Sequence, residues 1–276
     1  MISRILAVVL MMCAGNASAQ TFVKADGEEP TRKLMSADEA RDWQAVGRVN
    51  LPNGGFCTGA LIAPNLVLTA AHCVHDPYSS ELLDLTKISF AAGWRQGRAS
   101  AHRKARRVVV HQGYAHNGCA EFENVGNDIA LVELDHPIRN TSVVPFDRSA
   151  RPAIGAKVQV VSYAQNRAEI PSIEEPCEIL GKSMAVFVLS CSASFGASGA
   201  LIFVIENGQP KIASVILAKA TWKDQEVALG TSLGAPLEEL MDQLMQGKGL
   251  FNGNQVSSKS LSEQLGRTQS SAFLKN

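Results

Sequence analysis

The sequence is poor in aromatic residues and carries no excess of either charge. Phe, Trp and Tyr make up 6% of its 276 residues, and 26 Lys and Arg balance 26 Asp and Glu. A net charge of zero is unlike the basic field of a nucleic-acid-binding protein. The one dense basic run, residues 102–107, leads directly into three valines. We therefore interpret it as the charged flank of a strand and expect no nucleic-acid partner.

Hydrophobic runs long enough to cross a bilayer are also missing. Residues 5–13 form a short apolar stretch that follows Arg4 and precedes Ala17-Ser18-Ala19. This is the order of a secretory signal peptide with a small-residue cleavage site, and the run is too short for a spanning helix. Met12 precedes Cys13 where a lipid-anchor signal would have a small residue. We expect residues 1–19 to be removed and the mature protein to be secreted or periplasmic, without a stable membrane anchor.

Cysteines with metal-binding spacing are absent as well. The chain has six cysteines, and none of them forms a Cys-x-x-Cys pair. His75 follows His72 by three residues, but no third clustered His or Glu accompanies them, so we interpret His75 as a loop histidine and expect neither metal nor cofactor. Export favours disulfides. Removal of the signal peptide leaves five cysteines: Cys57, Cys73, Cys119, Cys177 and Cys191.

What fills the body of the chain is a series of short apolar segments separated by turn residues. We predict strands over 56–62, 66–69, 87–91, 107–110, 129–134, 157–163, 178–180, 186–191, 200–204, 211–217 and 227–231. Short strands at this density indicate an all-β barrel or sandwich. Residues 236–245 read as one amphipathic helix with a proline in its first turn.

Composition divides the chain into four parts. After the signal peptide, 20–42 is polar and is expected to be an N-terminal arm or a propeptide. The folded domain is expected over 43–246, with a turn-rich connection between two halves at 135–152. Residues 247–276 are rich in Gly, Asn, Ser, Gln and Lys, and we expect a disordered polar tail.

Three short motifs follow one another in the order His, Asp, Ser. They are Thr69-Ala70-Ala71-His72-Cys73, Asn127-Asp128-Ile129-Ala130-Leu131 and Phe195-Gly196-Ala197-Ser198-Gly199-Ala200. Each alone is equally compatible with a packed histidine, a turn before a strand or an ordinary glycine loop. Their joint occurrence at domain-scale spacing favours a catalytic triad, in an order that differs from those of α/β-hydrolases and subtilisins.

The chemistry of acyl transfer needs these residue types. A serine hydroxyl such as that of Ser198 is a poor nucleophile without a base within hydrogen-bond reach. His72 can accept its proton and return it to the leaving amine, while Asp128 would hold the second ring nitrogen. We assign the backbone N–H groups of Gly196 and Ser198 to the oxyanion hole, because neighbouring glycines let the backbone approach the developing charge.

These motifs, together with Phe56-Cys57-Thr58-Gly59-Ala60-Leu61-Ile62, resemble the trypsin/chymotrypsin-like serine peptidases. The similarity runs from about Trp43 to about Leu244 and leans towards the secreted bacterial branch, in which the nucleophile turn is short. It implies an all-β fold of two antiparallel β-barrels with a C-terminal helix and an active site at their seam. It also implies a Cys57–Cys73 disulfide.

The remaining cysteines and the specificity pocket are assigned by position. Cys177 and Cys191 bracket an apolar strand pair before the nucleophile turn, so we pair them and leave Cys119 unpaired. The resemblance places the substrate pocket along Ser192 and Phe195 and along Ser214 and Ile216. Ser192 stands where trypsins have the Asp that binds Arg or Lys, which predicts a neutral, modestly sized apolar residue before the scissile bond. Ser214 is also a candidate to bond Asp128.

The sequence departs from the family at the activation site. Ala197 stands where activatable trypsins carry an Asp, and Val46-Gly47-Arg48-Val49 lacks an Ile-Val-Gly-Gly-type activation sequence. We therefore expect an oxyanion turn that forms without an N-terminal ion pair.

The leading hypothesis is an exported, monomeric serine endopeptidase that hydrolyses protein or peptide substrates through an acyl-enzyme. One alternative is a catalytically silent trypsin-like binding protein. The other is an esterase that uses the same triad.

Overall fold

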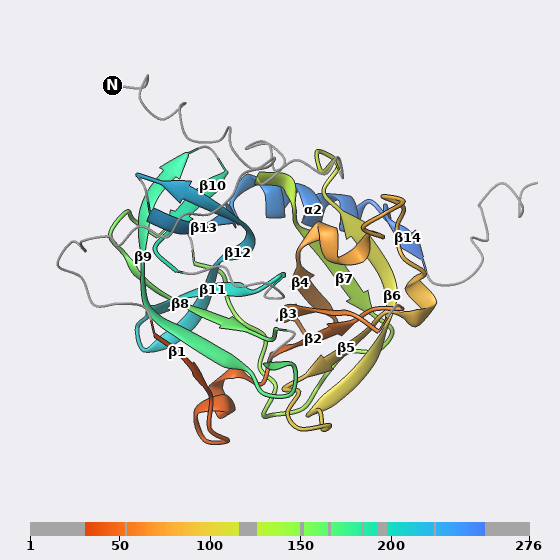
Figure 1. The fold of residues 1–276 in the computed structure, drawn as a ribbon. Coiled ribbons are helices and arrows are strands. Elements are labelled where there is room, and N and C mark those ends of the chain that lie inside the picture. The colour runs from red at the N-terminus through yellow and green to blue at the C-terminus, as the bar shows by residue number, and fades with distance from the viewer. Residues whose placement is uncertain are drawn as a thin grey trace, which may run out of the picture.

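The fold consists of two antiparallel β-barrels that lie side by side (Figure 1). The structure is a computed structural model that describes residues 31–251 except 53, 116–125, 150–151, 165–166, 184, 192–197 and 224. The first barrel contains β2 (Val46–Asn50), β3 (Phe56–Ala63), β4 (Leu66–Thr69), β5 (Ser89–Ala92), β6 (Ala101–Val110) and β7 (Ala130–Leu134). The second contains β8 (Lys157–Ser162), β9 (Ser172–Ser183), β10 (Val186–Leu189), β11 (Leu201–Glu206), β12 (Gln209–Trp222) and β13 (Gln225–Ser232).

Strand pairing closes each sheet on itself. The first barrel runs β6-β5-β2-β3-β4-β7 and closes through β6–β7, and the second runs β9-β10-β13-β12-β11-β8 and closes through β8–β9. A closed barrel leaves no exposed strand edge between its members. The predicted all-β fold with two barrels and a C-terminal helix is confirmed.

Each barrel is extended by a segment from the opposite end of the chain. β1 (Thr31–Leu34) pairs with β9 of the second barrel, and β14 (Leu250–Phe251) pairs with β6 of the first. Figure 1 shows α2 (Ala235–Met245) crossing from the second barrel towards β6 and β14.

The folded region is longer than predicted at both ends. η1 (Glu39–Trp43) begins before the expected boundary at residue 43, and Met35 is buried. Residues 31–42 of the predicted arm or propeptide are therefore part of the folded domain. Its remaining residues, 20–30, lie outside the described part, as do the signal peptide and 252–276 of the predicted tail.

The basic run lies within a strand and not, as predicted, on the flank of one. β6 begins at Ala101, six residues earlier than predicted, and its exposed side chains alternate at His102, Lys104 and Arg106. This period of two is the signature of a strand with one face in solvent. Arg107 is buried, and its Nε lies 2.7 Å from Oε2 of Glu133 on the neighbouring β7.

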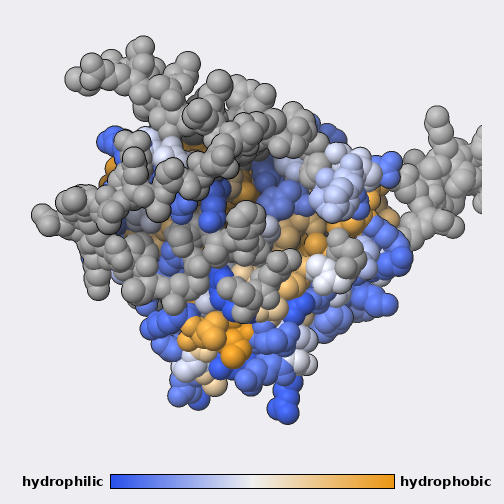
Figure 2. All heavy atoms as spheres, viewed as in Figure 1, coloured by the Kyte–Doolittle hydropathy of each residue, from blue (hydrophilic) through white to orange (hydrophobic). Residues whose placement is uncertain are grey.

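The hydrophobic core is continuous between the barrels. One cluster of buried side chains joins residues such as Leu68 and Leu131 of the first barrel to Leu201 and Phe203 of the second. A second cluster fills the second barrel alone. On the face shown in Figure 2, hydrophilic residues form most of the described surface, with hydrophobic residues in small groups between them.

The C-terminal helix α2 has eleven residues. Within the described part of the chain, no helix combines the length and the apolar character needed to cross a membrane.

Candidate active site

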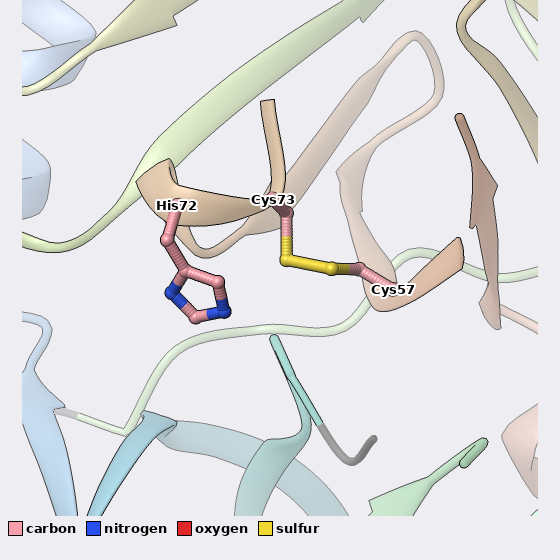
Figure 3. Close-up of side chains that lie close together, drawn as sticks. All are labelled: Cys57, His72 and Cys73. Carbon is pink, nitrogen blue, oxygen red and sulfur yellow. A yellow bond between two sulfur atoms is a disulfide. The ribbon is translucent and has the colours of Figure 1, made fainter. Parts of the chain in front are cut away.

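His72 lies on a short turn that is fixed on both sides. The turn is η2 (Ala71–Val74), which follows β4. Ala70 and Ala71 are fully buried, so their small side chains seat the turn on the core. Cys73 is bonded to Cys57 of β3, and Figure 3 shows the imidazole beside this disulfide. The sequence thus holds the histidine rigidly at the rim of the first barrel.

Asp128 contacts His72 twice. One carboxylate oxygen lies 2.7 Å from Nδ1 of the ring, and the other accepts the backbone N–H of His72 at 2.8 Å. Because a carboxylate accepts hydrogen bonds, this contact places a proton on Nδ1, and in the neutral ring it leaves Nε2 as an acceptor. Asp128 is 8% exposed. The arrangement fixes both the orientation and the tautomer of the imidazole.

Tyr114 lies close to this pair. Burial, and then the negative charge of Asp128, raise the pKa of Tyr114 above its ordinary value of 10.0. Its phenol therefore stays neutral at physiological pH. The ring of Tyr114 is 5.2 Å from the ring of His75, and Nδ1 of His75 lies 2.8 Å from the carbonyl oxygen of Ala71. His75 thus belongs to the loop beside the site.

Ser198 is held at the interface between the barrels. Its carbonyl oxygen accepts the backbone N–H of Thr58 at 2.9 Å. The side chain of Thr58 in turn accepts the backbone N–H of Tyr163 of the second barrel, also at 2.9 Å. In the described part of the chain, the hydroxyl of Ser198 forms no hydrogen bond with His72. Catalytic hydrogen bonds are often long in a substrate-free site and tighten in the reacting complex.

Gly199 packs against the turn that carries the histidine. Its φ of 71° is in the left-handed region, and a Cβ at this position would lie 2.4 Å from the carbonyl oxygen of Thr58. The same Cβ would lie 2.7 Å from Oγ1 of Thr69 and 3.4 Å from Sγ of Cys73. Only glycine tolerates both the left-handed φ and the close approach of these three neighbouring atoms. The serine turn and the histidine turn are thereby brought together.

The structure describes two of the remaining predicted site residues, Ser214 and Ile216, and leaves three outside the described part. Ser192, Phe195 and Gly196 lie outside the described residues. The hydroxyl of Ser214 donates to the carbonyl oxygen of Thr231 at 2.7 Å, so its single proton is not given to Asp128. Ile216 is 4% exposed and belongs to the core of the second barrel, so its side chain serves packing.

Both expected disulfides are present, Cys57–Cys73 and Cys177–Cys191. Cys119 lies outside the described residues. Cys57, His72 and Cys73 bring potential metal-ligating atoms within 4.8 Å of one another (Figure 3). The two sulfurs are bonded to each other, so they offer no thiolate to a metal.

Two residues that support the site were not predicted from the sequence. Thr58 and Thr69 are fully buried polar residues in otherwise apolar strands, and the hydroxyl of Thr69 donates to the carbonyl of Thr58 at 2.8 Å. A buried hydroxyl needs a partner, and this requirement is the signal that could have identified them.

Comparison with known proteins agrees with this geometry. A family model described as Trypsin matches residues 35–174, a range that contains His72 and Asp128 and ends before Ser198. The chain belongs to the trypsin-like serine protease family. Its fold is similar to that of a solved Glu endopeptidase, with a TM-score of 0.64 and 20% identity, over 80% of this chain and 98% of the other.

Sequence relatives share shorter regions. The chain is 34% identical over 112 residues to Serine protease filzig of Drosophila melanogaster, which is 39% of this chain and 6% of that protein. It is 25% identical over 174 residues to Trypsin Blo t 3 of Blomia tropicalis, 60% of each chain. The matches therefore cover less than two thirds of these relatives.

Proposed function

We propose that this protein is an exported serine endopeptidase in which Ser198, His72 and Asp128 form the catalytic triad. The observation that carries the proposal is the double contact of Asp128 with the ring and the backbone of His72, next to the turn of Ser198. Family membership supports the same reaction class.

The proposed reaction gives each of these groups one role. The Ser198 hydroxyl attacks the peptide carbonyl carbon while its proton passes to Nε2 of His72. Asp128 stabilises the resulting imidazolium. The proton then moves to the leaving amine, and the C–N bond breaks to give an acyl-enzyme. Water attacks this ester with His72 as the base and restores the hydroxyl. Backbone N–H groups of Gly196 and Ser198 are proposed to stabilise the oxyanion.

The first experiment tests the nucleophile. A fluorophosphonate should label Ser198, and Ser198→Ala should lower kcat by about 10⁶-fold while the protein stays folded. Ser183→Ala, a substitution at the end of β9, is the matched control and should leave kcat unchanged. Near-normal hydrolysis by Ser198→Ala would refute the triad.

The same reagents separate the two alternatives. A silent binding protein would not react with the fluorophosphonate, whereas an esterase would be labelled but would not cleave a peptide library. We propose peptide hydrolysis because the family is one of proteases.

Export and specificity are further parts of the proposal. The signal-peptide pattern predicts cleavage before Gln20, which N-terminal sequencing of secreted or periplasmic material would reveal, and we propose an origin in the secreted bacterial branch. Ser192 supports a neutral apolar residue before the scissile bond, because a buried cation without a carboxylate partner would be costly. Cleavage profiling of a denatured proteome that found a strong Arg, Lys or Glu preference would contradict this pocket assignment.

A further inference from the structure

A buried histidine outside the triad connects the C-terminal helix to the segment that carries Asp128. His111 directly follows β6 and is 6% exposed. Its Nε2 lies 3.0 Å from Oε2 of Glu239 on α2, and its Nδ1 accepts the backbone N–H of Gly113 at 3.2 Å. Since a backbone N–H can only donate, Nδ1 carries no proton and Nε2–H donates to Glu239. Both ring nitrogens are therefore engaged in one defined tautomer.

The backbone around His111 holds both neighbours of Asp128. The N–H of His111 donates to the carbonyl oxygen of Ile129 at 3.2 Å. The side-chain amide of Asn127 donates to the carbonyl oxygen of Gly113, also at 3.2 Å. Asp128 stands between these two anchored residues, so the direction of its carboxylate depends on where they are held.

Packing makes this connection stiff. A Cβ on Gly113 would lie 2.6 Å from Nδ2 of Asn127 and 3.3 Å from Cε1 of His111. The turn thus lies in close contact with Asn127 on one side and the imidazole on the other. A movement of the ring would be transmitted to Asn127, because close-packed groups have no space in which to absorb it.

We propose that His111 and Glu239 are positioning residues that hold Asp128 in the orientation in which it bonds His72. The proposal rests on the catalytic role proposed for Asp128 and assigns α2 a part in the reaction although it contributes no residue to the triad. Glu239 acts through His111, the Gly113 turn and Asn127.

Glu239 is the residue to substitute, because its side chain is 51% exposed and its loss should not prevent folding. Glu239→Ala removes the acceptor of Nε2–H, and Glu239→Gln keeps an oxygen that can accept the same bond. Glu238→Ala is the matched control, since Glu238 is the preceding residue of α2 and pairs with no cation among the described residues. Activity is expressed per active site titrated with a fluorophosphonate.

Glu239→Ala should lower kcat by about 3- to 10-fold with little change in KM, the pattern of an interaction lost from the transition state. Glu239→Gln should restore most of the rate, and Glu238→Ala should behave as the parent protein. The NMR resonance of the Nδ1 proton of His72, which reports its bond to Asp128, should shift in Glu239→Ala alone. A purely structural role would lower the melting temperature and leave this resonance in place.

Unchanged kcat per titrated site in Glu239→Ala, or an equal loss in Glu238→Ala, would overturn the positioning role. Failure of the parent protein to react with the fluorophosphonate would instead overturn the proposed function. In that case the shift of the His72 proton in Glu239→Ala relative to Glu238→Ala still decides whether Glu239 positions Asp128.

Discussion

Gly199 occupies the point at which the turn of Ser198 touches the first barrel. An alanine at this position would have a left-handed φ, and its Cβ would lie 2.4 Å from the carbonyl oxygen of Thr58. We expect Gly199→Ala to reduce the free energy of unfolding by about 1–3 kcal/mol and to lower kcat by at least about tenfold by displacing Ser198.

Gly208 provides the control for this substitution. It has a φ of 75°, close to that of Gly199, but no atom lies within 4 Å of a Cβ built on it. Gly208→Ala should therefore show the backbone strain without the loss of activity. Denaturant unfolding and kcat are measured for both variants, and equal kcat values would exclude a role of the close contact in placing Ser198.

Glu39 reports on the docking of the N-terminal segment. It accepts the backbone N–H of Ser36 at 2.8 Å, and its own N–H donates to Oγ of Ser36 at 3.2 Å, which is a capping box. The backbone bond from Ser36, and then the contact with Lys33, lower the pKa of Glu39 from 4.5 to about 2. Because the folded-state pKa is depressed, the contribution to stability is present above about pH 4.5 and is lost as the pH falls through about 2.

An NMR titration of the Glu39 carboxyl carbon tests this assignment. The midpoint should be at about pH 2. In Lys33→Ala it should rise but stay below 4.5, since the first cause is the Ser36 bond and not the lysine. A midpoint of 4.5 in the parent protein would mean that the capping box does not form in solution.

At the scale of single residues, the sequence predicted the contact between His72 and Asp128 and both disulfides. The family resemblance supplied the first two pairs, and the position of Cys177 and Cys191 around an apolar strand pair supplied the third. The sequence did not predict the partner of Ser214. Its hydroxyl can reach several acceptors, and the pairing of β12 with β13, which no local pattern specifies, puts the carbonyl of Thr231 within reach.

The Cys57–Cys73 bridge joins β3 to the turn of His72 and spans 16 positions of the sequence. Replacing both cysteines by alanine should lower the free energy of unfolding by about 3 kcal/mol through loop entropy. It should also lower kcat, because the His72 turn loses one of its two anchors. Cys177→Ala/Cys191→Ala, with a separation of 14, should cost similar stability.

The two double variants should differ in the NMR signal of the Nδ1 proton of His72, which should shift only when the first bridge is absent. Identical signals in both would show that Asp128 alone fixes the ring. Non-reducing peptide mapping of the parent protein first checks that the two bridges are present.

At the scale of elements, strands with a marked apolar pattern were predictable and polar ones were not. β4 is buried at every position and was predicted with its observed bounds. β2 was missed because Gly47 and Arg48 interrupt its apolar residues. β1 and β14 are short edge strands whose existence depends on a partner from the other end of the chain, and no local pattern encodes such a partner.

The two barrels should unfold together, because they share one core. Trp43 of η1 packs against Phe203 of β11, with ring centroids 4.7 Å apart, and against Phe146 of the connecting segment at 5.9 Å. Trp43→Ala should reduce the free energy of unfolding by about 3–5 kcal/mol. It should also lower the midpoint temperature of unfolding, which should remain a single calorimetric transition. Tyr78→Ala is the control, since Tyr78 is 96% exposed. Two separate transitions would contradict a shared core.

A polar contact also joins the two halves. The guanidinium of Arg48 on β2 lies 4.2 Å from the ring centroid of Phe56 and forms an ion pair of 3.2 Å with Glu169 of the second half. Burial lowers the pKa of Arg48 from its ordinary value, while the carboxylate of Glu169 acts in the opposite direction. The charge is retained because an arginine ionises far above physiological pH.

Each terminal segment pairs with the barrel formed by the other half of the chain. This pairing has a consequence for biosynthesis. When the ribosome has completed β7, all six strands of the first barrel exist, but Arg107 still lacks the carbonyl oxygen of Leu244, to which its Nη1 donates at 3.1 Å. The ring of Phe251, 5.0 Å from the same guanidinium, is made later still. Domains usually fold from the N-terminus as they emerge, yet here the first barrel buries a cation whose last partners, Leu244 and Phe251, follow the second barrel in the sequence. We therefore expect the barrel that carries His72 to reach its full stability only after α2 and β14 have been synthesised.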